Sequence, residues 1–279
     1  MKKILKRTGM FLGGLIVLIL LTSLVLYPIG MKKLKKTYRN ITVETISIPT
    51  DSNAITRGKH VAIIWACTHC HGDNLGGTIM KHDPLGGNIP TLGTIPASNL
   101  TSGKGGISQS YNNTDWVRAI RHGVKPNGHV EVFMYNYSSM SDRDLGDLIA
   151  YLKQIPPVDS DFPKKKYGPI IPITPAIGIF KPAAEIIEHS APRLADPVPG
   201  VTIEYGKYIS TLCVQCHGDG FGKTMKKWKQ EDFIRTFHSG ILPNGKQFGP
   251  TMSSETFREM NDMELSALWT YLQNKSSHR

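Results

Sequence analysis

Acidic residues are missing from the first 39 positions, which hold nine of the chain's 33 lysines and arginines. The remaining residues carry 24 basic against 22 acidic side chains, so the net charge of +11 belongs mostly to the N-terminal segment. A basic surface on the body, of the kind that binds nucleic acid, therefore has little support, and we expect no nucleic-acid partner. Charged residues make up 20% and hydrophobic residues 40%, a balance that does not fit a disordered chain.

Charge of either sign is missing from positions 8–31. A helix of about 20 apolar residues crosses a hydrocarbon core of roughly 30 Å. The run is longer than the core of a cleavable signal peptide and ends in "YPIGMKKLKK", without a small-residue cleavage pattern. We therefore expect residues 1–39 to form an uncleaved signal anchor with a basic flank. Four basic residues precede the span and five follow it, so charge alone does not orient it.

Alternation typical of β-strands is also missing, and the body instead contains an internal repeat. The segment "DWVRAIRHGVKPNG" (115–128) matches "DFIRTFHSGILPNG" (232–245), and "DLGDLIAYL" (144–152) matches "ELSALWTYL" (264–272). The last pair has apolar residues at helical spacing, and Ser141 or Asn261 precedes each as a candidate N-cap. We predict an all-α body of two tandem domains, at residues 40–155 and 201–279.

The two copies differ in one loop and are separated by an unusual linker. The second copy lacks about 30 residues that follow the first Cys-x-x-Cys-His, in a loop at 73–114 that is long for a simple connection. Residues 156–200 hold more than half of the chain's 18 prolines together with many isoleucines. We expect this linker to pack across both domains and to fix their separation.

Cysteine is scarce: there are only four, and all lie in "CTHCH" (67–71) and "CVQCH" (213–217), 146 residues apart. Two Cys-x-x-Cys pairs could form one zinc site, but each lies in its own copy of the repeat. A thioredoxin-like pair needs a βαβ setting, and none is predicted. Haem attachment accounts for the histidine after each second cysteine, because two thiols on one helical turn reach both vinyl groups. We predict two covalently attached haem c groups, held by Cys67, Cys70 and His71 and by Cys213, Cys216 and His217.

A second axial ligand is expected after each "PNG" turn, and methionine there favours electron transfer. In the first copy Met134 is preferred to Met140, because Met134 lies 11 residues after Gly123 as Met252 lies 12 after Gly240. In the second copy Met252 is preferred to Met260, which directly precedes a helix cap. A methionine is often only a core filler, and His82 and His129 are the alternatives if Met134 is not the ligand.

These motifs make the chain resemble the class I cytochrome c family over residues 50–155 and 201–275. "NLTSGKGGI" followed by "DWVRAIRHGV" also looks like the dihaem cytochrome subunits of membrane alcohol and gluconate dehydrogenases. The resemblance implies a small residue where first and last helices cross, opposite an aromatic residue, which Gly58 with Tyr151 and Gly206 with Tyr271 fit. It also implies a proline whose carbonyl orients the axial histidine, a role that Pro96 suits. Trp116 and Phe233 are expected beside haem, whereas Arg118 and Arg235 fit either the propionates or solvent equally.

The resemblance further implies a location and a function. Haem is attached outside the cytoplasm, so the body would lie on the periplasmic face of a bacterial cytoplasmic membrane. We expect an electron carrier rather than an enzyme, placed between a dehydrogenase or quinol-oxidising complex and a terminal acceptor. Two alternatives stay open: a dihaem peroxidase, if one haem has an open distal side, and a subunit that mainly anchors a partner dehydrogenase.

Overall fold

The computed structural model describes residues 2–79, 93–218, 222, 225, 227–249, 252 and 254–277. The body is mostly helical, as predicted, and is divided below into a first half (40–155), a linker (156–200) and a second half (201–277). The first half contains α2 (Ser52–Ile64), α3 (Cys67–His71), α4 (Asn113–His122) and α5 (Asp142–Leu152), and the second half contains α8 (Ile203–His217), α9 (Gln230–Ser239), α10 (Ser254–Arg258) and α11 (Asp262–Ser277).

The prediction of a purely helical chain misses one very short sheet. Strands β1 (Gly93–Thr94) and β2 (Lys166–Tyr167) pair in antiparallel fashion. They join the long loop of the first half to the linker. A strand of two residues has no alternating pattern, so periodicity could not have indicated it.

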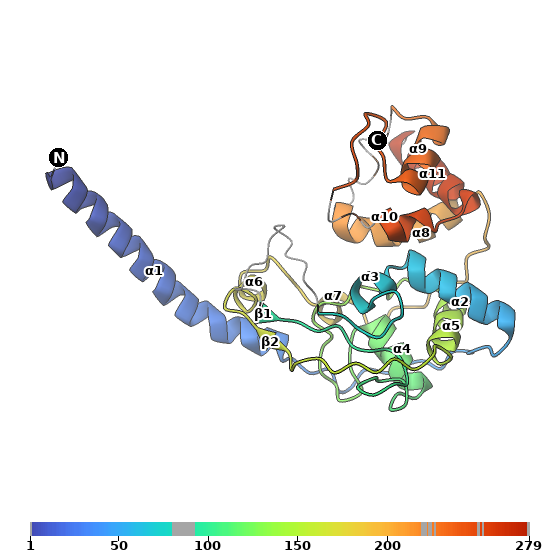
Figure 1. The fold of residues 1–279 in the computed structure, drawn as a ribbon, viewed down its shortest axis with the longest axis horizontal. Coiled ribbons are helices and arrows are strands. Elements are labelled where there is room, and N and C mark those ends of the chain that lie inside the picture. Colours follow the sequence, from blue (N-terminus) through green and yellow to red (C-terminus); the bar gives the residue numbers. More distant parts are fainter. Residues whose placement is uncertain are drawn as a thin grey trace.

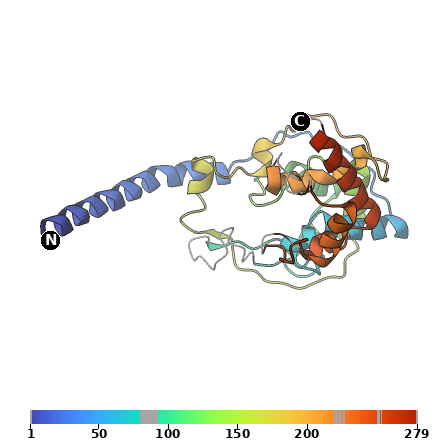
Figure 2. The ribbon, with the colours of Figure 1, turned by 90° about the horizontal axis from the view of Figure 1, so that it is seen from above.

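A long N-terminal helix, α1 (Lys2–Leu34), projects away from the body in both views (Figures 1 and 2). It is long and apolar enough to cross a membrane, and none of its most apolar stretch is buried against the rest of the chain. Only its C-terminal end packs on the body, where Gly30 and Leu34 are buried. The apolar segment is thus free along most of its length.

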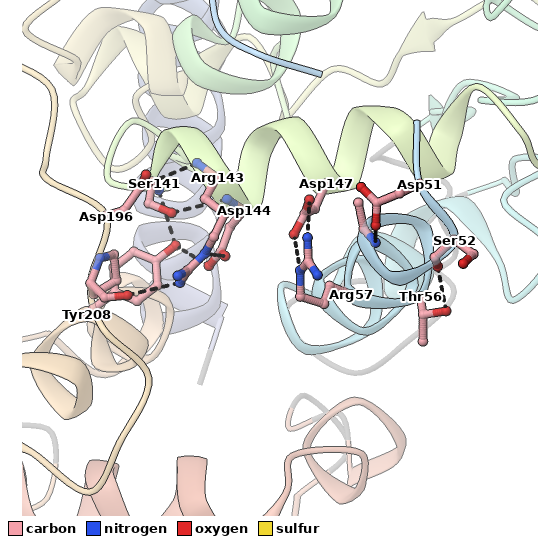
Figure 3. Close-up of polar contacts among 12 residues, drawn as sticks. Asp51, Ser52, Thr56, Arg57, Ser141, Arg143, Asp144, Asp147, Asp196 and Tyr208 are labelled. Carbon is pink, nitrogen blue, oxygen red and sulfur yellow. Dashed lines mark hydrogen bonds and ion pairs between the residues drawn. The ribbon is translucent and has the colours of Figure 1, made fainter. Parts of the chain in front are cut away.

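In the first half, α2 and α5 cross at a glycine. A Cβ atom on Gly58 would lie 1.9 Å from the carbonyl oxygen of Asp147 and 2.9 Å from Cβ of Tyr151, so the two backbones touch. Beside this contact, Arg57 donates from Nε and Nη2 to the buried carboxylate of Asp147 at 2.6 and 3.1 Å (Figure 3). This crossing confirms the role that the resemblance implied for Gly58 and fixes the end of α2 that leads into the first motif.

In the second half, α8 and α11 cross in the same way. A Cβ on Gly206 would lie 2.0 Å from the carbonyl oxygen of Ala267 and 2.8 Å from Cβ of Tyr271. The cap of α11 is also as predicted, because Asn261 and Glu264 each accept a hydrogen bond from the other's backbone N–H. The repeat seen in the sequence is therefore a repeat of helix packing.

The turns that follow the short helices repeat bond for bond. Gly123 and Gly240 end α4 and α9 in the left-handed conformation, with φ of 63° and 72°. Their carbonyls accept from the N–H groups of Glu131 and Phe248, at 2.7 and 2.9 Å. Each turn thus returns the chain to the end of its helix, which places the segments carrying Met134 and Met252 in equivalent positions.

The opening helix differs between the two halves. The helix α8 runs into the second motif without a break, whereas the first half breaks between α2 and α3. Ala66 has a left-handed φ of 59°, which ends the helical conformation there. The carbonyl of Trp65 accepts from the hydroxyl of Tyr137 at 3.0 Å.

The linker packs on the first half. Val158 accepts from Asn99 Nδ2 at 2.7 Å and donates to Thr101 Oγ1 at 2.9 Å. Further along, α6 (Ile173–Ala176) lies beside α1, and α7 (Ala183–Ile186) follows it. An apolar cluster joins the end of α1 and the first half to Ile171 and Ala184. These contacts hold the linker to the first half and to α1. They confirm the part of the prediction that concerns packing on the first domain.

The two halves share one apolar core, in which Tyr208 of α8 contacts the first half. Its ring lies 5.5 Å from that of Trp65, and its hydroxyl donates to Asp144 at 2.7 Å and accepts from the Ser141 N–H at 3.1 Å (Figure 3). His60 and Glu264 form a second link at 2.8 Å. Apolar contact and satisfied polar groups together define a fixed interface between the halves.

Candidate haem sites

A cavity of about 390 Å³ lies beside the first motif. Its wall includes Cys67, Cys70 and His71 of α3 and, from another part of the chain, Met134. Apolar side chains make up much of the remainder, and the linker closes one side through Ser160, Asp161, Phe162, Pro163 and Lys165. The predicted ligands and attachment residues of the first half therefore line one cavity of a size typical of cofactor sites.

The ring of His71 is oriented by a backbone carbonyl, but not by the predicted one. Its Nδ1 lies 2.7 Å from the carbonyl oxygen of Ser98, two residues after Pro96. A carbonyl only accepts, so Nδ1 carries the proton and Nε2 keeps its lone pair for a metal. Burial lowers the pKa of His71, which also favours the neutral ring. The assignment of this role to Pro96 was wrong: Pro96 lines the cavity, and Ser98 supplies the carbonyl.

Three of the four cysteine thiols are shielded from water. Burial raises the pKa of Cys67 and of Cys213 to about 12, and it also raises the pKa of Cys70. Burial thus favours the protonated thiol at these three positions.

Both candidate methionines of the first half line the cavity, but in different ways. Met140 is fully buried in the core, and its carbonyl accepts from Arg121 Nη2 at 2.9 Å. Met134 is only partly buried, on a segment that packs against the core. Of the alternatives, His129 is exposed and is not part of the cavity wall, and His82 lies outside the described residues. Met134 and His71 thus line one cavity, which is compatible with the prediction of Met134 as the ligand.

An unsatisfied polar group supports a bound carboxylate. Trp116 Nε1 is buried, and no hydrogen-bond partner is found for it among the described residues. Trp116 also lines the cavity. A buried N–H without a partner costs about 1–3 kcal/mol, which a ligand acceptor would recover. Together with two thiols, a neutral imidazole and a thioether, this donor set fits haem c with its propionates.

The second site is more open. Cys213 is buried at the end of α8, whereas Cys216 and His217 are exposed. Met252 is half-buried and packs against the shared core, and its N–H donates to the Gly249 carbonyl at 2.9 Å. Met260 is buried in that core, in keeping with the lesser role assigned to it.

Tyr135, next to Met134, connects the two motifs. Burial, together with the nearby Cys216 and Cys70, raises its pKa to about 12. Tyr135 therefore lies within electrostatic range of the second cysteine of each motif. Sequence inspection gave Tyr135 no role, because nothing in its spacing marks a contact across 81 positions.

A backbone clamp reinforces this junction. The side chain of Gln215, inside the second motif, accepts from the Asn136 N–H at 2.8 Å and donates from Nε2 to the Asn136 carbonyl at 3.0 Å. The amide thus satisfies both polar groups of one residue. The attachment motif of the second half consequently holds the loop that carries the candidate ligand Met134 of the first.

The two arginines of the short helices have different surroundings. Nε of Arg118 is buried without a hydrogen-bond partner among the described residues. Arg235 is largely exposed and donates to Asp232 at 2.5 Å. Trp116 and Phe233 are both buried, and Trp116 lines the cavity beside the first motif.

Each of the two glycine-crossed helix pairs is joined to a Cys-x-x-Cys-His motif. The family model for cytochrome c, a family of haem-binding electron-transfer proteins, matches residues 55–156. The match covers the first copy, and the second copy repeats its motif and helix packing.

Two curated relatives are distant homologues. The fructose dehydrogenase cytochrome subunit of Gluconobacter japonicus is 24% identical over 269 residues, covering 81% of this chain and 54% of that protein. The gluconate 2-dehydrogenase cytochrome c subunit of Pantoea cypripedii is 29% identical over 181 residues, covering 58% of this chain and 37% of that protein. The chain therefore spans about half the length of the first relative and just over a third of the second.

Proposed function

We propose that this protein is a membrane-anchored dihaem c-type cytochrome that carries single electrons as the cytochrome subunit of a membrane dehydrogenase. Haem c, when bound, supplies an iron that exchanges one electron without making or breaking a substrate bond. Cys67, Cys70 and His71 with Met134 would hold one group, and Cys213, Cys216 and His217 with Met252 the other. The residue boundaries 40–155 and 201–279 are proposed for the two domains.

The observation that carries this proposal is the contact between the second motif and the loop of Met134. The side chain of Gln215, within the second motif, hydrogen-bonds both backbone polar groups of Asn136, two residues after Met134. The two halves also share one apolar core. A fixed contact of this kind supports a relay of electrons between two sites within one chain.

The proposed partner follows from the relatives, whose names place them in fructose and gluconate dehydrogenases. A dehydrogenase subunit that oxidises a sugar or sugar acid is therefore the proposed electron donor, and a quinone or a terminal oxidase the acceptor. α1 would be the anchor, with the body on the periplasmic face. The exposed Cys216 and His217 make the second half the proposed docking side.

A dihaem peroxidase requires one site with no protein ligand on the distal side. Met134 lines the same cavity as His71, which favours a closed site in the first half.

The test is the full chain, produced with a haem-attachment system and purified in nanodiscs. Haem is counted per chain, and spectra are recorded oxidised, reduced, and reduced with carbon monoxide. We expect two covalent haems and no spectral change with carbon monoxide. A carbon monoxide complex at one haem would favour the peroxidase, and a chain without covalent haem would overturn the proposal.

Paired variants separate the sites. Cys67→Ala with Cys70→Ala, and Cys213→Ala with Cys216→Ala, should each keep one haem. Each remaining haem should then titrate at a potential different from its potential in the intact protein, because the neighbouring charge is gone. Identical potentials in intact and single-haem proteins would contradict the relay.

A further inference from the structure

The linker contains an apolar loop, residues 169–180, whose two faces differ. Ile171 and Pro175 are buried, and Phe180 packs against the apolar cluster of the first half. Ile170, Ile177 and Ile179 point outward, with exposed fractions of 43%, 51% and 76%. The inner face thus anchors the loop, and the outer face leaves three isoleucines uncovered within a short stretch. An exposed apolar group of this kind marks a contact surface.

The loop is attached to α1 at a defined position along the helix axis. A Cβ on Gly30 would lie 1.5 Å from the carbonyl oxygen of Pro172, so the backbones of α1 and the loop are in contact. One turn further on, Lys33 Nζ donates to the carbonyl of Pro175 at 2.9 Å. Figures 1 and 2 both show α6 beside the C-terminal end of α1. The loop therefore cannot move along α1 independently.

This position on α1 coincides with the end of its apolar run. About 20 helical residues span a hydrocarbon core of roughly 30 Å, which for α1 places a segment such as 10–29 inside the membrane. Gly30 then lies at the boundary, followed by the lysines at 32, 33, 35 and 36. The outward isoleucines, attached at Gly30, are placed at the same level.

The charges around the loop fit a membrane surface. Lys164, Lys165 and Lys166 precede the loop, Lys181 follows it, and all four are exposed. No acidic residue occurs from 162 to 184. Anionic headgroups attract such basic flanks while apolar side chains enter the boundary of the acyl chains.

We infer that residues 169–180 form a second membrane contact, which lies on the bilayer surface beside α1 and sets the orientation of the first half. The inference rests on α1 being the membrane anchor that the proposed function requires. Because the loop also packs on the apolar cluster of the first half, and the linker closes one side of the cavity at Cys67, contact with lipid would fix the first site relative to the membrane. A single helix would leave the body free to swing.

The linker supplies a matched control. Leu194 and Val198 are as exposed as the loop isoleucines, at 53% and 81%, and lie in the same proline-rich segment. Their neighbours Asp196 and Pro197 are bonded to Arg143 of α5, at 2.9 Å each, rather than to α1. Apolar exposure alone would predict equal behaviour at 177–179 and 194–198, whereas a membrane contact predicts lipid at the first segment only.

The experiment uses the full chain with both haems, in nanodiscs that contain phosphatidylglycerol and a phospholipid with a diazirine in its acyl chain. After photolysis, peptide mass spectrometry locates the lipid adducts. We expect adducts in α1 and in 169–180, at a yield several-fold above that in 194–201. The variant Ile177→Ser with Ile179→Ser should lose most adducts in the loop and keep those in α1. Leu194→Ser with Val198→Ser should change neither.

The outcomes separate the two ideas. Adducts in α1 without adducts in 169–180 would overturn the second contact and leave the anchor intact. Equal adducts in 169–180 and 194–201 would also overturn it, because exposure alone would explain them. No adducts in α1 would mean that the helix does not insert, and the anchor and the second contact would fail together.

Discussion

The side-chain amide of Gln215 hydrogen-bonds both the backbone N–H and the backbone carbonyl of Asn136, 79 residues away in the chain. Gln215 is part of the second Cys-x-x-Cys-His, and Asn136 lies two residues after Met134 of the first half. The loop of the first site is therefore held by the other copy of the repeat. An x position of the motif carries this link, whereas its three fixed residues, Cys213, Cys216 and His217, are the proposed attachment and iron-binding residues.

Loosening that link should affect the first site although the substitution lies in the second. We expect Gln215→Ala to lower the free energy of unfolding by about 1–2 kcal/mol, because two hydrogen bonds are lost. The loop of Met134 would then be less constrained, and part of the protein should bind carbon monoxide at the first site. Denaturant titration and carbon monoxide difference spectra measure the two effects.

Gln154→Ala is the control for this prediction, since Gln154 is exposed just beyond the end of α5. It should leave stability and spectra unchanged. If Gln215→Ala also binds no carbon monoxide, the clamp does not position the loop.

Replacing Met134 tests the proposed ligand directly. Met134→Ala should open the first site to carbon monoxide and abolish the methionine-to-iron absorption of that site. Met134→His should keep the site closed and lower its reduction potential, by a sizeable part of the roughly 0.8 V that axial ligands span.

Met140→Leu separates ligation from packing, because Met140 lines the same cavity but is fully buried. It should alter stability by less than about 1.5 kcal/mol and leave the spectrum intact. If Met140→Leu, and not Met134→Ala, opens the site, the ligand has been misassigned.

The cap formed by Asn261 and Glu264 depends on short-range spacing, and the structure has it as predicted. The glycine crossings join distant segments; they were expected from the resemblance to class I cytochromes c, and the structure has them too. Met134 could be chosen from the sequence because the repeat aligns its turn with the turn before Met252. In the structure Met134 and His71 line one cavity.

What the sequence missed depends on contacts between distant segments. The carbonyl that meets His71 belongs to Ser98, because the course of the loop, not its proline, decides which oxygen faces the ring. The left-handed conformation of Ala66 ends α2, and the neighbouring Trp65 carbonyl accepts from Tyr137, 72 residues away. Neither contact has a spacing rule.

The glycine crossings can be tested as a matched pair. Gly58→Ala and Gly206→Ala each place a Cβ about 2 Å from a backbone carbonyl oxygen. A backbone atom cannot move aside as the end of a flexible side chain would. We expect each substitution to lower the free energy of unfolding by about 1–3 kcal/mol or more, and to lower the haem content of the affected half. Gly200→Ala meets only a methyl group at 3.8 Å and should be neutral. Thermal melts and haem content check this, and a neutral Gly58→Ala would refute the close approach.

The ion pair between His60 and Glu264 makes the interface of the halves sensitive to pH. The hydrogen bond to Glu264 raises the pKa of His60 above its ordinary value of 6.5, despite partial burial. A raised folded-state pKa gives stability that is fully present below 6.5 and is lost as pH rises through the folded value. The effect should not exceed about 1 kcal/mol, because His60 is 35% exposed and water screens the pair. Denaturant titrations from pH 5 to about 8.5 should therefore show a decline in the intact protein that His60→Gln flattens. An unchanged slope in His60→Gln would show that other groups produce the decline.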